Sequence, residues 1–182
     1  EPLLIEEETA DIRCVNPACP AQLTRTIAYF CGRSAMDIMG LGETLIDALV
    51  KDGYLKDYAD IYTLKDHRDE LIEKGLIGKE KNTDKLLSNI EASKQNSPVQ
   101  LLTGFGIRNV GGSTARGLME NYGSVRELSA APEEALSAVQ DIGPATARCI
   151  RAFFDSPEAQ EILKKLLHFF IKLPQGSLCH RF

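Results

Sequence analysis

The stretch IMGLG at residues 38–42 has three shorter counterparts, GKE at residues 78–80, NVG at 109–111 and DIG at 141–143. Their closing positions, 42, 80, 111 and 143, follow one another at intervals of 38, 31 and 32 residues. Apolar residues on both sides of each copy have helical spacing, and no segment after residue 20 alternates as a strand would. Each copy is therefore predicted to be a tight turn between two helices. A single hairpin is too small to bury its apolar face, so the four hairpins are expected to stack into one mainly α domain.

The glycines of the first copy make it suitable for binding phosphate. Gly40 and Gly42 flank Leu41, which we expect to point into the core while the glycines let the backbone approach a ligand closely. The second helix begins at the turn, so its unpaired N–H groups and the positive end of its dipole face the same point. Several such turns on one face would hold both backbones of a duplex across its minor groove, without reading base sequence.

The four copies are not equivalent. Asn109 and Asp141 occupy the first glycine position in the third and fourth copies, and these residue types tolerate left-handed backbone geometry. In the second copy Glu80 takes the closing position and places a negative charge where phosphate would bind, although three lysines surround it. The turns at residues 40–42, 109–111 and 141–143 are therefore predicted to bind phosphate, and the turn at Glu80 is not.

The predicted DNA-contacting residues belong to these three turns and to two neighbouring arginines: Gly40, Leu41, Gly42, Arg108, Asn109, Gly111, Ile142, Gly143 and Arg148. For Arg116 and Arg151, a position on a solvated helix face explains the sequence as well as a contact to phosphate does. Glycine turns between helices are commonly structural C-caps, which would be sufficient explanation for one copy alone. Their recurrence favours DNA binding, and a helical DNA- or protein-interaction module that stands alone is the alternative.

Charge and composition leave this interpretation open. The chain has 182 residues, of which 43% are hydrophobic and 26% charged, with a net charge of −5. Five acids and no base fall in residues 1–11, so the remainder is neutral, with room for a local basic face or for contacts through backbone amides. No apolar run approaches the ~20 residues that cross a bilayer, so no membrane partner is expected. No acid, base and nucleophile cluster together, so no catalytic residue is predicted.

Cysteines mark the start of the chain. A short hairpin is predicted from the apolar residues 3–5 and Ile12, and Cys14 and Cys19 follow it in a compact knuckle. Two thiolates supply half of the tetrahedral shell of a structural zinc, and no histidine is near in sequence. The five cysteines are odd in number and too thinly spread for a disulfide framework, which favours a reducing cytoplasm. Cys31 and Cys149 lie in apolar helical surroundings and are predicted core residues.

Taken together, residues 14–22, residues 34–43 and the stretch IRNVG at 107–111 resemble the C-terminal half of bacterial NAD-dependent DNA ligases, over roughly residues 1–167. The resemblance implies three regions. Residues 1–22 would be a small partial four-cysteine zinc finger, with Cys14 and Cys19 as its second cysteine pair. Residues 23–167 would be a tandem helix-hairpin-helix DNA-binding domain of four hairpins, and residues 168–182 are a tail that matches nothing expected of the family.

The same resemblance implies a function. The parent ligase would seal nicks in double-stranded DNA during replication and repair, in the bacterial cytoplasm near the nucleoid, using NAD, Mg and Zn and its own adenylation and OB domains. The family's adenylated lysine lies in a Lys-x-Asp-Gly motif, which this sequence lacks; Lys51-Asp52-Gly53 has no intervening residue and is predicted to end a helix. The chain is therefore expected to bind duplex DNA without sequence preference, to have no ligase activity alone and to bind none of these cofactors itself.

Overall fold

Helices make up nearly all the regular structure of the computed structural model, which describes residues 3–5, 12–14 and 20–170. The elements are β1 (Leu3–Ile5), β2 (Ile12–Cys14), α1 (Pro20–Cys31), α2 (Glu43–Lys51), the 3-10 helix η1 (Tyr58–His67), α3 (Arg68–Lys74), α4 (Glu80–Ser93), α5 (Pro98–Gly104), α6 (Gly112–Asn121), α7 (Val125–Ala130), α8 (Glu133–Ser137), α9 (Pro144–Asp155) and α10 (Pro157–Phe169). The predicted mainly α class is confirmed. None of the helices in these ranges is long and apolar enough to cross a membrane.

The N-terminal strands form the short hairpin expected from the sequence. They pair antiparallel, with Leu3 opposite Cys14 and Ile5 opposite Ile12. Cys19 and the rest of residues 15–19 lie outside the described residues, so the zinc-finger knuckle stays a prediction.

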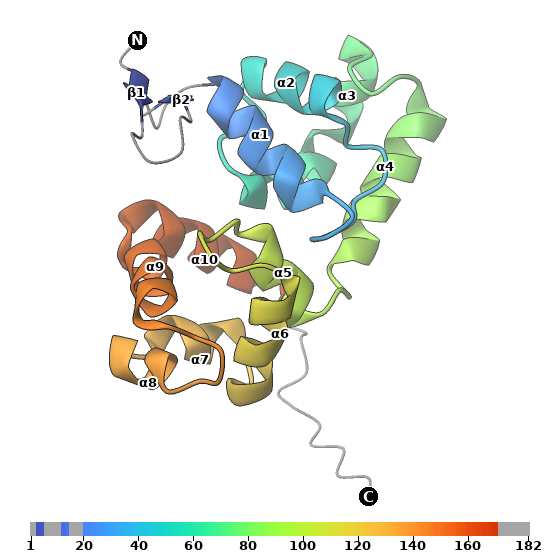
Figure 1. Cartoon of the computed structure of the whole chain (residues 1–182). Coiled ribbons are helices and arrows are strands. Elements are labelled where there is room, and N and C mark those ends of the chain that lie inside the picture. The colour runs from blue at the N-terminus through green and yellow to red at the C-terminus, as the bar shows by residue number, and fades with distance from the viewer. Residues whose placement is uncertain (1–2, 6–11, 15–19, 171–182) are drawn as a thin grey trace, which may run out of the picture.

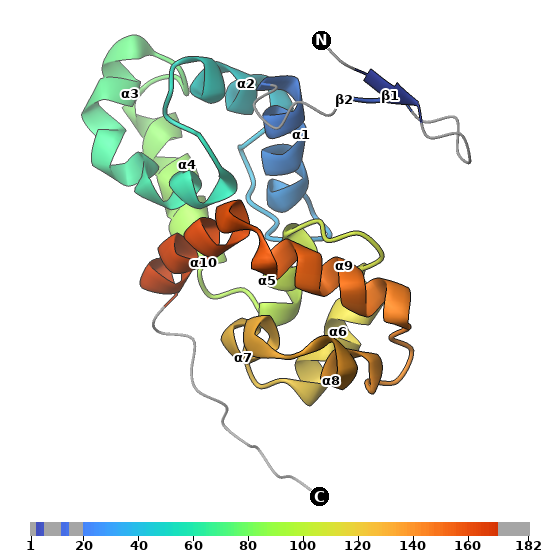
Figure 2. The ribbon, with the colours of Figure 1, turned by 90° about the vertical axis from the view of Figure 1, so that its left-hand side faces the viewer.

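Each repeated stretch lies between two helices that contact each other. These pairs are α1 with α2, α3 with α4, α5 with α6, and α8 with α9. The 3-10 helix η1 joins the first two pairs, and α7 joins the last two. The chain therefore forms two halves, α1–α4 and α5–α9, shown at the top and bottom of Figure 1. Helix α10 crosses between them and contacts η1 and α9, as Figure 2 shows from the side.

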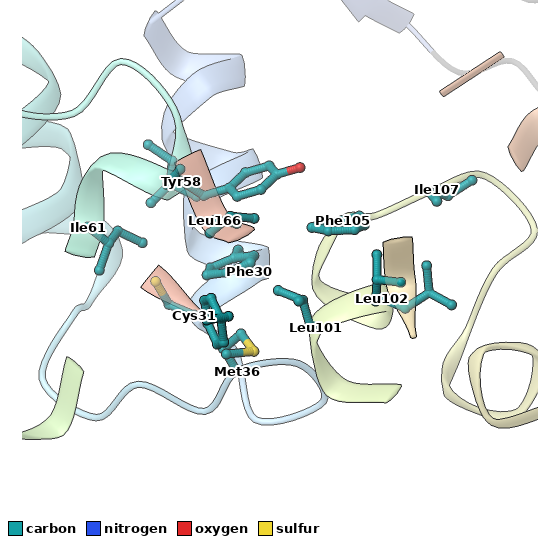
Figure 3. Packing of buried hydrophobic residues seen from close by; sticks show 14 of the residues in the cluster. Phe30, Cys31, Met36, Tyr58, Ile61, Leu101, Leu102, Phe105, Ile107 and Leu166 are labelled. Carbon is teal, nitrogen blue, oxygen red and sulfur yellow. The ribbon is translucent and has the colours of Figure 1, made fainter. Parts of the chain in front are cut away.

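A column of aromatic rings joins the two halves. The ring of Phe30 in α1 stacks on Tyr58 in η1 with centroids 4.6 Å apart. Tyr58 in turn lies 6.0 Å from Phe105 at the end of α5, and Phe105 stacks on Phe153 of α9 at 5.5 Å. Figure 3 shows Phe30, Tyr58 and Phe105 converging from three elements, with Leu166 of α10 beside them. The hairpins therefore share one core. This is expected, because a single hairpin is too small to bury its own apolar face.

Helix α10 runs past residue 167, where the sequence suggested that the helical body ends. The reason is aromatic packing: the ring of Tyr62 lies 5.8 Å from Phe169 and 5.2 Å from Phe170. Phe170 is buried, and Lys165 holds the same helix to η1 through an ion pair with Asp57 of 2.7 Å. The body thus includes residues 168–170, and the rest of the expected tail, 171–182, lies outside the described residues.

Gly104 gives a direct test of this packing. A Cβ atom at Gly104 would lie 2.9 Å from Cδ2 of Phe30, whose ring is held in place by its stack with Tyr58. We expect Gly104→Val to lower the free energy of unfolding by about 1–3 kcal/mol, because the core is already filled there. Gly117→Ala in α6, where a Cβ meets nothing within 4 Å, should instead raise it by about 0.5–1 kcal/mol. Urea denaturation measures both, and equal stability of Gly104→Val and wild type would contradict the packing argument.

Candidate nucleic-acid interface

Three of the repeated turns share one backbone geometry. The residue two positions before the helix N-cap has a left-handed conformation in each, with φ of +97° at Gly40, +66° at Asn109 and +64° at Asp141. Asn109 and Asp141 therefore adopt the conformation that their residue types were predicted to tolerate. The left-handed residue reverses the chain so that the next helix starts at once.

The middle residue of each turn anchors it to the core. Leu41, Val110 and Ile142 are exposed by only 6%, 4% and 5%. The residue four positions after each N-cap is fully buried as well; these residues are Ile46, Ala115 and Ala147. The predicted inward orientation of Leu41 is thus confirmed, and Ile142 is buried in the same way. Because each turn is held to the core on both sides, its backbone lies at the surface, beside the exposed side chains of Asn109 and Asp141 in the third and fourth copies.

That outer surface is open. The N-caps of α2, α6 and α9 are Gly42, Gly111 and Gly143, all extended and none with a side-chain cap. A Cβ at any of the three would meet nothing within 4 Å. By contrast, a serine side chain caps each of α5, α7 and α10, which do not follow a repeated turn. The free N–H groups in the first turns of α2, α6 and α9 therefore receive no side-chain cap from the described residues and suit an anionic ligand such as phosphate; in α9 they begin after Pro144, which has no N–H.

The second turn is built in a different register from the one that the sequence suggested. Its N-cap is Lys79, and the left-handed residue, Gly78, directly precedes it. Thr83 is fully buried and donates its amide to the Lys79 carbonyl at 3.1 Å, as Ile46 does to Gly42. Glu80 is therefore the first residue of α4 and does not close the turn. This turn has neither the buried apolar centre nor the closing glycine of the other three.

A charged network surrounds Glu80. Arg68 is the first residue of α3. Its guanidinium pairs with the carboxylates of Glu80 at 2.8 Å and Asp84 at 2.6 Å, and these two ion pairs join α3 to α4. The hydrogen bonds from Arg68 lower the pKa of Asp84. The negative charge of Glu80 is thus directed toward a neighbouring arginine, in a network that holds the second pair of helices together.

The first turn is supported by this second pair. The side-chain amide of Asn89 in α4 donates to the Met39 carbonyl at 2.9 Å. A Cβ at Gly40 would lie 3.2 Å from Cδ1 of Leu86, also in α4. No pattern in the sequence indicates this role of Asn89, because a contact across 50 residues has no local signature.

Comparisons with known proteins agree with this geometry. Residues 100–163, from α5 into α10, match the family described as "Helix-hairpin-helix motif". The chain is 48% identical over 161 residues to "DNA ligase" of Clostridium kluyveri, covering 88% of this chain and 24% of the relative. It is 41% identical over 162 residues to "DNA ligase" of Brevibacillus brevis, and 39% identical over 169 residues to that of Bacillus cytotoxicus. This chain is homologous to a segment of DNA ligase. It spans about a quarter of the length of these relatives.

Two of the arginines that the sequence singled out are exposed. Arg108 lies in the third turn, and Arg148 lies on α9. The side-chain amide of Asn109 donates to Sγ of Cys149 at 3.9 Å. This contact brings the third turn against α9, so Arg108 and Arg148 are each one residue from the same junction between two hairpins.

Arg151 has a structural role, whereas the sequence left its role open. Its guanidinium donates to the carbonyls of Ser129 at 2.7 Å and Ala131 at 3.0 Å, and it pairs with Asp155. These contacts satisfy the carbonyls at the end of α7 and join α7 to α9. Arg116 is exposed on α6.

Only part of the predicted zinc site falls among the described residues. The backbone of Cys14 ends β2, and Cys19 lies outside the described residues. Within the part of the chain that the structure describes, no group of three or more metal-ligating side chains occurs. Cys31 is a core residue as predicted, and burial raises the pKa of its thiol to about 12. Cys149 is half-buried and packs at the edge of the core.

The two arginines of α9 should behave differently on substitution. Arg151→Ala removes the partners of two carbonyls, and we expect it to lower the free energy of unfolding by about 1–3 kcal/mol. Arg148→Ala, at an exposed position, should change it by less than about 0.5 kcal/mol. Thermal denaturation of the two variants beside wild type measures the difference. If Arg148→Ala were the more destabilising variant, the structural role of Arg151 would be refuted.

Proposed function

We propose that this chain is the portion of an NAD-dependent DNA ligase that binds double-stranded DNA by its phosphates, without reading base sequence. The observation that carries the proposal is the set of open helix N-termini at Gly42, Gly111 and Gly143. Backbone amides at helix N-termini hydrogen bond to phosphate oxygens and are attracted to them by the helix dipole. They make no contact with base edges, so the binding follows the backbone of the duplex.

Amide contacts also explain how a chain with a net charge of −5 can bind a polyanion. Phosphate binding by arginine and lysine alone would require an excess of basic residues on the binding face. In this proposal the turns supply most contacts through backbone dipoles, and exposed Arg108 and Arg148 add charge at the junction of two hairpins. Leu41 and Ile142 contribute by holding the turns in the core.

In the parent enzyme, this portion would hold a nicked duplex against the adenylation and OB domains during replication and repair. NAD and Mg would serve the chemistry of sealing the nick, which needs a lysine that this sequence lacks. Cys14 and Cys19 offer two thiolates, half of a tetrahedral zinc site, so completing that site requires two ligands from elsewhere in the parent. The expected location is the bacterial cytoplasm, close to the nucleoid.

Fluorescence anisotropy with a labelled nicked duplex tests the proposal. The 182-residue chain should bind, and its dissociation constant should rise steeply with salt, because phosphate contacts release counterions. A duplex of scrambled sequence should bind equally well. Absence of binding at low salt would refute DNA binding and favour a protein-interaction module instead.

Side chains added at the three N-cap glycines should block the phosphates. Gly42→Val, Gly111→Val and Gly143→Val should each weaken binding by about tenfold or more, since a hydrogen bond to a charged group contributes about 1.5–3 kcal/mol. The added atoms have open space. The free energy of unfolding of each variant should therefore fall by no more than about 1 kcal/mol, through the change of N-cap residue. Gly117→Val, also in open space but inside α6, is the matched control and should bind as wild type does.

Arg108 gives a second readout. Arg108→Ala should weaken binding to all duplex sequences alike and reduce the slope of log Kd against log salt by about 1, the value for one lost phosphate contact. An unchanged slope would show that Arg108 does not contact a phosphate. It would not bear on the prediction for the three N-cap glycines.

A further inference from the structure

Two large hydrophobic side chains are exposed among the residues whose side chains the structure describes. They are Met39, exposed by 71%, and Tyr29, exposed by 45%. Both lie at turns of the proposed DNA interface. Met39 belongs to the first turn, and a ring atom of Tyr29, Cδ1, lies 3.6 Å from where a Cβ of Gly106 would be, at the start of the third.

The position of Met39 has counterparts in the other two open turns. Met39 directly precedes the left-handed residue Gly40, as Arg108 precedes Asn109 and Gln140 precedes Asp141. All three preceding residues are exposed. The same structural position is thus occupied by three different side-chain groups, which are an apolar thioether, a guanidinium and an amide. Arginine and glutamine are residue types that hydrogen bond to phosphates and groove edges, whereas methionine can do neither.

The backbone of Met39 is also firmly held. Its carbonyl accepts a hydrogen bond from Asn89 at 2.9 Å, and the next residue, Gly40, packs against Leu86. Contacts with α4 therefore fix the point on the backbone from which the side chain of Met39 extends into solvent. A fixed attachment point lowers the entropy lost when the side chain makes a contact.

We propose that Met39 is an apolar contact to the minor groove, seated on deoxyribose and base edges between the phosphates bound by the first turn. This inference rests on the proposed function, because it places Met39 against the same duplex. Methionine is among the apolar side chains that proteins insert into the minor groove, and its flexible thioether adapts to irregular surfaces. The contact adds affinity at the first turn without adding charge.

Salt dependence separates this contact from a phosphate contact. Met39→Ala should weaken binding to the nicked duplex by about tenfold, because apolar area that leaves water on binding is lost. The slope of log Kd against log salt should stay unchanged, since an apolar contact releases no counterions. Met39→Leu should retain most of the affinity, and Met39→Glu should lose more than Met39→Ala. With Met39 so exposed, all three variants should keep the melting temperature of wild type.

Oxidation of methionine reports the contact directly. The chain has three methionines, and each has a different environment: Met36 is fully buried, Met119 is partly buried in α6, and Met39 is exposed. Limited peroxide treatment followed by peptide mass spectrometry measures sulfoxide at each. Saturating nicked duplex should slow oxidation of Met39 severalfold and leave the rate at Met119 unchanged.

The outcomes distinguish this inference from the function on which it rests. If the wild-type chain fails to bind the duplex at low salt, the proposed function fails and the inference with it. If the wild-type chain binds but Met39→Ala binds equally well, or DNA does not slow oxidation of Met39, only this inference is overturned. A reduced salt slope in Met39→Ala would also overturn it, because the contact would then be made to a phosphate.

Discussion

The relative positions of the turns depend on one aromatic column. Tyr58 lies between Phe30 of the first half and Phe105 of the second, at 4.6 Å and 6.0 Å. Its hydroxyl is buried with no hydrogen-bond partner among the described residues, and burial raises its pKa, so the side chain remains neutral. Packing alone therefore holds the ring in place. Each turn is a local feature, but two turns can meet one duplex only if the rings between them fix their distance and orientation.

Anchoring from within leaves the outer surface of each turn free for a ligand. The buried centre of each open turn, such as Leu41 or Ile142, holds the backbone in place, so no side chain is needed to cap the following helix. The amides at that end stay available, and a rigid set of donors binds phosphate with little reorganisation. The second pair of helices differs in this respect: it contributes Asn89 and Leu86 to the support of the first turn, and its own charges pair with Arg68.

Features that depend on a few consecutive residues could be predicted from the sequence. Asn109 and Asp141 adopt left-handed geometry, and Lys51 ends α2 with Gly53 at φ +80° just beyond it. The register of the second turn was predicted wrongly. Glycines at 75 and 78 both take positive φ, so the short pattern does not show which residue caps α4. Burial of Thr83 decides it, and that burial comes from packing against other elements.

The sequence by itself thus determined the helical class, the positions of the turns and the resemblance to part of a DNA ligase, because backbone preference and hydrophobic spacing are local. Only the tertiary structure decided what each side chain contacts. Arg148 and Arg151 look alike in sequence, yet one is exposed and the other binds two carbonyls of a preceding helix end. Met39 is apolar and lies two residues before the buried Leu41, but it is exposed because none of the described elements covers its side chain. Exposure and pairing depend on segments far away in the chain, and no local pattern encodes them.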